Sequence, residues 1–204
     1  MFSILKFSFI KVICFCLLVI VSPNNKSNSH KEEVLFNVLK NDSSVGFLKV
    51  SKLKKGDMVF YEAKSKVQAR FIVNFIASGK DSVIFSKGQL LYSSQFRKIN
   101  SRIKVNQSIQ WQNGKYVLND KGEEEVLHFS RIPQNLIPLF INEPGFEKVY
   151  SDKFHCILPI EKIEDHVYLV QFPNGDYNIY KYSNGICQSV TVKGTFFKVE
   201  LIKQ

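Results

Sequence analysis

The chain has 204 residues, with 28 Lys or Arg, 18 Asp or Glu and a formal net charge of +10. Its basic residues are scattered and do not form the Arg/Lys stripe with interleaved aromatic residues that is typical of nucleic-acid binders, so we expect no nucleic-acid partner. The length is enough for one domain with a sizeable core.

The first 22 residues have the pattern of a secretory signal peptide. Lys6 and Lys11 precede an uncharged apolar run at residues 12–21. A basic start followed by about 7–15 apolar residues is typical of such a signal, whereas a membrane-spanning helix needs roughly 20. The sequence therefore predicts an exported protein of the periplasm or cell envelope.

This segment is expected either to be cleaved or to remain as an anchor. Cleavage between Ser22 and His30 would release the protein, and an uncleaved segment would be a bare anchor. Cys14 and Cys16 lack the small preceding residues expected of a lipid-modified cysteine, so we expect no lipid attachment. Residues 23–32, rich in Asn and Ser, are predicted to be a flexible linker.

Residues 33–204 are predicted to form an antiparallel β domain. Asn-Gly pairs such as Asn113-Gly114 and Asn184-Gly185 favour two-residue hairpin turns. Between the turns, apolar and polar residues alternate as on a strand with one buried face. We expect about eleven strands, at residues 33–40, 46–53, 57–64, 66–77, 81–86, 89–98, 102–111, 115–119, 124–130 and three or four more after 146.

A proline-rich segment at residues 133–145 interrupts the strands. Pro138 excludes a long helix, but a short helical turn at residues 135–141 is allowed. Its apolar side chains would cap or plug one end of the sheet. Because a sheet of so many strands is difficult to protect at its edges, the predicted fold is all-β, a single antiparallel barrel or half-barrel with this short plug.

Aromatic residues are abundant, with 18 Phe and 8 Tyr in the chain. They either fill the core or line an apolar cavity between sheet and plug, as in small barrels that hold a ligand. The alternation at residues 67–77 predicts one long strand with Phe71 and Phe75 on one face. The candidate ligand-binding residues are Phe36, Phe60, Phe71, Phe75, Trp111, Phe140 and Phe172.

Two cysteines remain after the signal segment, Cys156 and Cys187. In an oxidising compartment they are candidates for a disulfide, and the alternative is two buried thiols. No CxxC, HxH or HExxH spacing is present, so we expect no metal site and no cofactor.

The sequence contains no catalytic constellation with a recognisable spacing. Ser151 and Asp152 lie near His155 in the chain, but there is no Gly-x-Ser-x-Gly elbow. Glu143, before Pro144, is expected to take part in a turn and to accept backbone N–H groups. A small hydrolase or isomerase built on these residues is the third of the functions considered, behind two non-enzymatic ones.

Several short motifs resemble the DUF6134 family, a group of uncharacterised exported proteins of Bacteroidota. They are an early strand ending near Gly46, Leu139-Phe140-x-x-Glu143-Pro144, Tyr150-Ser151-Asp152 and Tyr180-x-Tyr182-x-Asn184-Gly185. The layout is also similar to half-barrels of the lipoprotein-carrier type. The resemblance implies a fold and a compartment and no reaction.

The leading functional hypothesis is an exported, non-enzymatic protein that binds an apolar or lipid-like ligand. The alternative is an envelope interaction or scaffold protein with a filled barrel, whose partner is an envelope protein or the membrane surface. A large apolar void would favour the first hypothesis, and a packed interior would favour the second.

Overall fold

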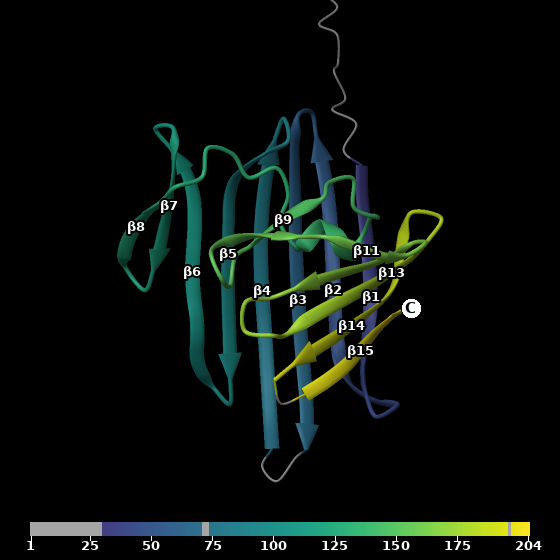
Figure 1. Ribbon diagram of the computed structural model, residues 1–204. Helices are drawn as coiled ribbons and strands as arrows, with labels where there is room; N and C mark the ends of the chain where they lie inside the picture. The colour runs from purple at the N-terminus through teal and green to yellow at the C-terminus, as the bar shows by residue number, and fades with distance from the viewer. Residues whose placement is uncertain (1–29, 71–73, 196) are drawn as a thin grey trace, which may run out of the picture.

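The structure is a computed structural model that describes residues 30–70, 74–195 and 197–204 (Figure 1). Within them the chain is nearly all-β, as predicted. The elements are β1 (His30–Lys40), β2 (Ser43–Lys55), β3 (Met58–Arg70), β4 (Asn74–Ser86), β5 (Gln89–Ile99), β6 (Arg102–Gln112), β7 (Lys115–Asp120), β8 (Glu123–Leu127), the 3₁₀ turn η1 (Ile137–Phe140), β9 (Lys148–Ser151), β10 (Cys156–Pro159), β11 (Glu161–Glu164), β12 (Val167–Gln171), β13 (Tyr177–Ser183), β14 (Ile186–Gly194) and β15 (Phe197–Lys203).

Thirteen of these strands form one antiparallel sheet in the order β11-β12-β13-β14-β15-β1-β2-β3-β4-β5-β6-β7-β8. Strands that follow one another in the chain pair from β1 to β8 and from β11 to β15. Strand β15 returns to pair with β1, so that Phe36 lies opposite Lys203. The two ends, β8 and β11, do not pair with each other. The sheet is therefore a half-barrel, which confirms the predicted fold class.

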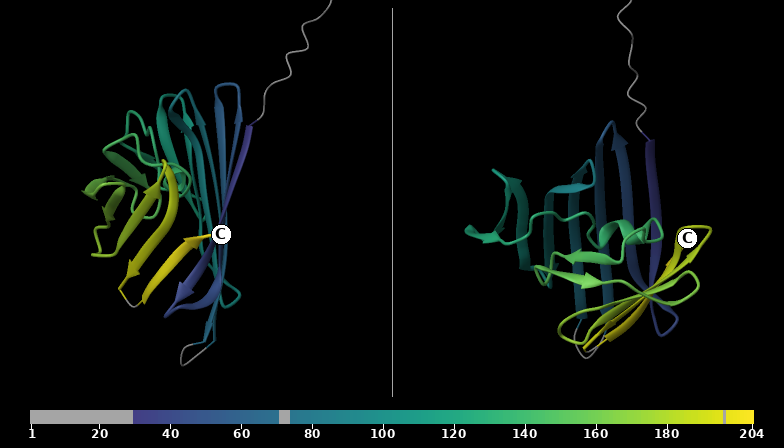
Figure 2. Two further views of the ribbon diagram at one scale, coloured as in Figure 1. Left: turned by 90° about the vertical axis from the view of Figure 1, so that its right-hand side faces the viewer. Right: turned by 45° about the horizontal axis from the view of Figure 1, so that its top comes forward.

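Strands β1 to β6 form a tall wall, and the C-terminal strands β12 to β15 curl over its inner face (Figures 1 and 2). The segment of residues 128–160, called the plug below, contains η1 and the β9–β10 hairpin and lies between them. In the side view of Figure 2, none of the described elements covers the outer face of the wall. No helix among the described residues is long and apolar enough to cross a membrane.

Strand alternation decides which side chains form the core. In β1, Val34, Phe36 and Val38 are buried, whereas Leu35 between them is 38% exposed. The same period of two continues in β4, where Val83 and Phe85 point inward. The core therefore fills the space between the concave face of the sheet and the plug.

The Asn-Gly turns are where the sequence predicts them. Asn113-Gly114 joins β6 to β7, and Asn184-Gly185 joins β13 to β14. All four residues have positive φ angles, 49° and 80° in the first turn and 50° and 74° in the second. Two consecutive positive φ values are what a type I′ hairpin turn requires, and Asn and Gly tolerate them best.

The predicted long strand at residues 66–77 is wrong. The chain turns between β3 and β4, which pair so that Arg70 lies opposite Asn74. Ala69 lies opposite Phe75, so these two face the same side, and β4 resumes the alternation of β3 in the same phase. The expected turn at residues 78–81 lies inside β4 instead.

The structure also contains more strands after residue 146 than the three or four predicted. Seven strands follow, and β9, β10, β11 and β12 have only four or five residues each. A period of two cannot be read reliably over so few residues. These short strands are therefore visible only in the tertiary arrangement.

Candidate functional site

Hydrogen bonds to the sheet hold the plug in place. The Tyr182 hydroxyl of β13 donates to the Leu139 carbonyl in η1 at 2.7 Å. At the start of the plug, the Tyr116 hydroxyl accepts from the Ile132 N–H and donates to the Leu90 carbonyl, both at 3.1 Å. Each tyrosine thus satisfies plug backbone groups that burial would otherwise leave unpaired.

Glu143 fastens the end of the proline-rich segment to β12. Its carboxylate accepts from the Tyr168 hydroxyl at 2.6 Å and lies 3.0 Å from His166 Nδ1. The Tyr168 hydrogen bond, followed by His166, lowers the pKa of Glu143. Glu143 thus contacts the side chains of Tyr168 and His166, and not the backbone N–H groups that the sequence predicts as its partners.

A small cavity of about 180 Å³ remains between the plug and the concave face of the sheet. Its apolar lining residues are Leu48, Ala63, Leu136, Ile137 and Phe140. Its polar lining residues come from both the sheet and the plug and are called the polar wall below: Ser65, Gly79, Asp81, Gln95, Arg97, Asp152, Asn178 and Tyr180. The chain thus combines an apolar surface and buried charges in one cavity, which we regard as the candidate site.

A bidentate ion pair between Asp81 of β4 and Arg97 of β5 forms part of the polar wall. Arg97 Nη2 donates to Asp81 Oδ2 at 2.7 Å, and Nη1 donates to the other carboxylate oxygen. The Asp81 side chain is 9% exposed. Gly79 makes room for the guanidinium, because a Cβ there would lie 3.1 Å from Arg97 Cδ and Nη1.

Asp152, at the end of β9, brings a second carboxylate to the cavity from the plug. It is 5% exposed and accepts from Asn135 Nδ2 at 3.0 Å. Burial raises the pKa of Asp152 to about 6, and the Ser93 hydroxyl and the Asn135 amide offset only part of that rise. The Gln107 amide donates to the Asp152 carbonyl at 2.6 Å and ties the plug to β6.

Buried polar atoms without a protein partner occur around Asp152. Gln134 Nε2, Tyr150 Oη and Ser151 Oγ have no hydrogen-bond partner in the described structure. Leaving such a group unpaired costs about 1–3 kcal/mol. None of these residues lines the cavity.

Two of the seven aromatic residues predicted to line a cavity meet inside the sheet. The ring centroids of Phe36 and Phe140 lie 6.0 Å apart in an edge-to-face arrangement, and Tyr180 lies 5.6 Å from Phe140. Phe140 and Tyr180 line the cavity, and Phe36 packs behind them in the core. These rings pack edge to face between η1 and the sheet.

Four of the other five lie in the described part of the chain, and none of these four lines the cavity. Trp111 packs against Tyr116 with centroids 4.6 Å apart, and Phe172 stacks on Phe154 at 5.6 Å. Neither pair lines the interior cavity. The Trp111–Tyr116 and Phe154–Phe172 contacts therefore lie away from the candidate site.

Phe60 lies on the opposite face of the sheet. Its neighbour Tyr61 packs against the core, so alternation directs Phe60 outward, between Leu53 and Ile84 of the adjacent strands. Phe75 is half-buried near the start of β4, and Phe71 lies outside the described residues.

Sequence reasoning missed the polar wall. Asp81, Gln95 and Arg97 occupy inward positions of otherwise alternating strands, and a charged residue at an inward position was the available signal. Because residues 78–81 were predicted to be a turn, Asp81 was not recognised as an inward-facing residue of a long strand. Asn178 and Tyr180 were read only as part of a strand, because their part in the wall depends on the curl of β13.

Cys156 and Cys187, the disulfide candidates, are free thiols in the structure. Cys187 is fully buried in β14, and burial raises its pKa to about 12. No group of three His, Cys, Asp or Glu side chains among the described residues is arranged to hold a metal ion.

The candidate catalytic residues do not converge. Ser151 is fully buried and its hydroxyl has no partner, whereas His155 Nε2 lies 3.2 Å from the Gln107 amide. Glu143 pairs with Tyr168 and His166 instead. A Ser–His pair, which nucleophilic catalysis requires, is therefore not formed.

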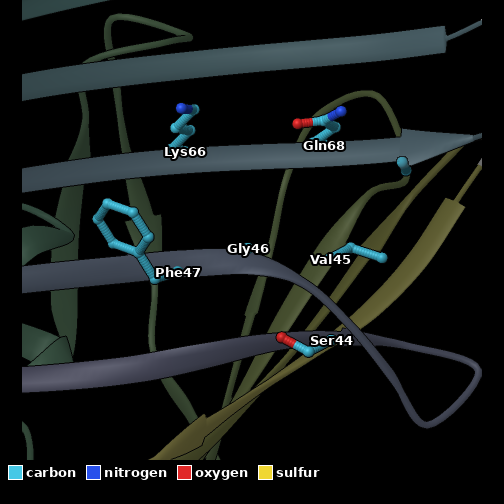
Figure 3. A pocket seen from close by; sticks show the side chains of 7 residues that line it. Ser44, Val45, Gly46, Phe47, Lys66 and Gln68 are labelled. Carbon is cyan, nitrogen blue, oxygen red and sulfur yellow. The ribbon is translucent and has the colours of Figure 1, made fainter.

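A separate hollow lies at a β-bulge near Gly46 (Figure 3). Val38 and Leu39 of β1 pair with Gly46 and Ser44, so Val45 is the extra residue. A Cβ at Gly46 would lie 2.0 Å from the Lys66 carbonyl oxygen, so the position requires glycine. Figure 3 shows Phe47, Lys66 and Gln68 standing apart around an open depression, which we attribute to this close backbone approach.

The comparisons with known proteins concern the fold and the family. The chain is similar to a beta-barrel-like protein of domain of unknown function DUF1849 from Brucella abortus, with 10% identity, a TM-score of 0.53 and coverage of 84% of this chain and 94% of that one. At this identity the likeness shows the fold alone. No curated protein matches the chain. The family model described as "Domain of unknown function (DUF6134)" matches residues 36–204, and the chain therefore belongs to the DUF6134 family.

Proposed function

We propose that the protein is an exported, non-enzymatic binding protein that holds a small amphipathic, lipid-like ligand between the sheet and the plug. The observation that carries this proposal is a cavity between the sheet and the plug whose lining combines apolar and polar side chains. Ligand sites in proteins commonly combine an apolar lining with a few placed polar groups.

The size of the cavity limits the ligand. At about 180 Å³ it is smaller than the roughly 300–1,000 Å³ of typical small-molecule sites. The proposal therefore concerns a short chain or the end of a longer one, placed against Leu48, Ala63 and Ile137. A longer chain would have to displace η1.

The charges of the polar wall select the polar end of the ligand. Asp81 is neutralised by Arg97, and Asp152 has no cationic partner, so the wall carries a net negative charge above pH 6. A carboxylate end would be repelled there. A neutral or cationic end would be accepted there and would donate a hydrogen bond to the Asp152 carboxylate.

Export is part of the proposal and rests on the basic, apolar start of the sequence, with Lys6, Lys11 and residues 12–21. A lipid-like ligand suits that location, because the cell envelope is where such molecules are abundant.

Calorimetric titration with three six-carbon probes, 1-hexanol, hexylamine and hexanoate, tests the site. We expect binding of hexanol and hexylamine and weaker binding of hexanoate at pH 7.5. Ala63→Leu fills the cavity from β3 and should abolish binding, whereas Lys64→Leu, on the outer face of the same strand, should not. Binding to Ala63→Leu that equals binding to the unaltered protein would remove the basis of the proposal.

The alternative, an envelope interaction or scaffold protein, is favoured by the packing of the Phe36, Phe140 and Tyr180 rings against one another and by the small volume of about 180 Å³ that remains beside them. It predicts that none of the three probes binds and that crosslinking in cells captures a single envelope partner. The titration therefore separates the two functions.

A further inference from the structure

The outer face of the sheet carries a groove that runs across four strands. The register places Ser82 of β4 opposite Ser94, Ser94 opposite Ser108, and Ser108 opposite Asn119 of β7. All four side chains are half-buried. Neighbouring strands lie about 4.8 Å apart, so short polar side chains with hydroxyl or amide groups recur at that interval along the groove.

Bulkier residues form the two sides of this groove. Tyr92 lies opposite Ile84 on one side, and Phe96 lies opposite Lys80 on the other. The hollow between them measures about 780 Å³, within the range of roughly 300–1,000 Å³ of small-molecule sites. Figure 2 shows that none of the described elements covers this face of β4 to β6.

The side with Phe96 is basic. Lys49, Lys64 and Lys80 lie directly opposite one another on β2, β3 and β4. Like charges in such positions are destabilising. Glu62 offsets part of the repulsion, at 2.5 Å from Lys64 Nζ and 3.2 Å from Lys80 Nζ. Lys121, which also lines the hollow, adds a positive charge at its other end.

From this arrangement we infer a second binding site, for an acidic glycan strand lying across β4 to β7. The sugar ring that lies over β5 would be flanked by Tyr92 and Phe96 on the two sides of the groove, and ring hydroxyls would bond to the serines. The acidic groups would meet Lys80 and Lys121. The strand spacing of about 4.8 Å is close to the length of one sugar ring in an extended chain, so successive rings would meet successive strands.

This site is independent of the proposed function. The serine groove faces away from the cavity, since Ser82 and Ser94 alternate with the inward-facing Asp81, Val83 and Gln95. The Ala63→Leu variant, which fills the cavity, should therefore leave glycan binding unchanged. Either site can fail its test without affecting the other.

Binding of the full chain to three probes at 150 mM salt tests the inference. The probes are an oligogalacturonate, a neutral dextran oligosaccharide and polyglutamate of matched charge. We expect oligogalacturonate to bind at least about tenfold more tightly than either of the others, because it alone combines rings with charge.

Variants locate the site. Ser94→Leu obstructs the groove and Tyr92→Ala removes a stacking face, and each should weaken oligogalacturonate binding about tenfold or more. Ser78→Leu is the matched control, on the outer face of β4 but outside the hollow. Circular dichroism verifies that each variant is folded. Equal binding of polyglutamate, no binding of oligogalacturonate, or unchanged binding by a folded Ser94→Leu variant would overturn the inference.

Discussion

Asp81 and Arg97 show how a strand accommodates charge on its inward face. The two side chains lie diagonally across β4 and β5, and Gly79 provides the space that their contact requires. Removing one member of a buried pair leaves the other charge uncompensated, which is more destabilising than the loss of one hydrogen bond.

We therefore expect Arg97→Met to lower the free energy of unfolding by up to about 3 kcal/mol, with the cost reduced because the Arg97 side chain is 36% exposed. Urea denaturation measures the change. The double variant Arg97→Met/Asp81→Asn removes both charges and should be more stable than Arg97→Met alone. Equal stability of the single and double variants would show that the uncompensated carboxylate is not the cause.

Asp152 gives a prediction about pH. Its pKa is about 6 in the folded protein and about 3.9 in the unfolded chain, so the folded state binds more protons between these values. The contribution of Asp152 to stability therefore falls as pH rises from about 4 to about 6. Above about pH 6, Asp152 lowers the free energy of unfolding by a constant amount of about 2–3 kcal/mol.

Asp152→Asn should consequently stabilise the protein at pH 7.5 by about 2–3 kcal/mol and make little difference at pH 4. The asparagine oxygen can still accept from Asn135. Urea midpoints across pH 4 to 8 provide the measurement, with the exposed Asp57→Asn as the control. A stabilisation that is the same at both pH values would contradict the account.

At the scale of elements, two hairpin turns were predictable from the sequence and the connection between β3 and β4 was not. Asn113-Gly114 and Asn184-Gly185 specify their turns locally, because positive φ at two successive residues favours those residue types. Strands β3 and β4 have the same phase of alternation on the two sides of residues 71–73. Periodicity alone therefore predicts one continuous strand there.

The plug was predictable from its prolines, and η1 lies within the expected helical turn. Its attachment was not predictable, because Tyr116 and Tyr182 reach it from strands far away in the sequence. Phe36 and Phe140 were named as candidate cavity residues, but their contact with each other depends on the curl of the sheet. Asp152 was named only as a candidate catalytic residue, and the rest of the polar wall was missed because it depends on the β4–β5 register.

The attachment of η1 can be tested on its own. Tyr182→Phe leaves the Leu139 carbonyl without its hydrogen bond and should cost about 1–2 kcal/mol. Because the lost contact holds the plug, hydrogen exchange should accelerate at residues 137–142 more than in β3. Tyr177→Phe, in the same strand, is the control. Uniform acceleration over the sheet would mean that Tyr182 stabilises the whole fold and not the plug.

At the scale of the molecule, the half-barrel has two free edges, β8 and β11. Unpaired edges favour association with other strands unless charged residues protect them. In β8, Glu123, Glu124 and Glu125 are all exposed. We interpret this acidic run as protection of the edge.

Replacing these three residues by Thr, Val and Thr should therefore convert the protein from its native oligomeric state to larger, concentration-dependent species. Light scattering coupled to size-exclusion chromatography measures the change. A triple Gln variant separates the loss of charge from the gain of strand propensity. Unchanged molar mass of the Thr/Val/Thr variant would show that β8 is protected by something other than charge.

The central claim is that the space between sheet and plug holds an amphipathic ligand. Native mass spectrometry of the full chain, purified from the envelope of cells that produce it, is the most direct measurement. We predict an additional mass from a small amphipathic molecule with a neutral or cationic polar end, retained by Lys64→Leu and absent from Ala63→Leu. The bare polypeptide mass in every sample, together with no binding of the hexyl probes, would contradict the claim.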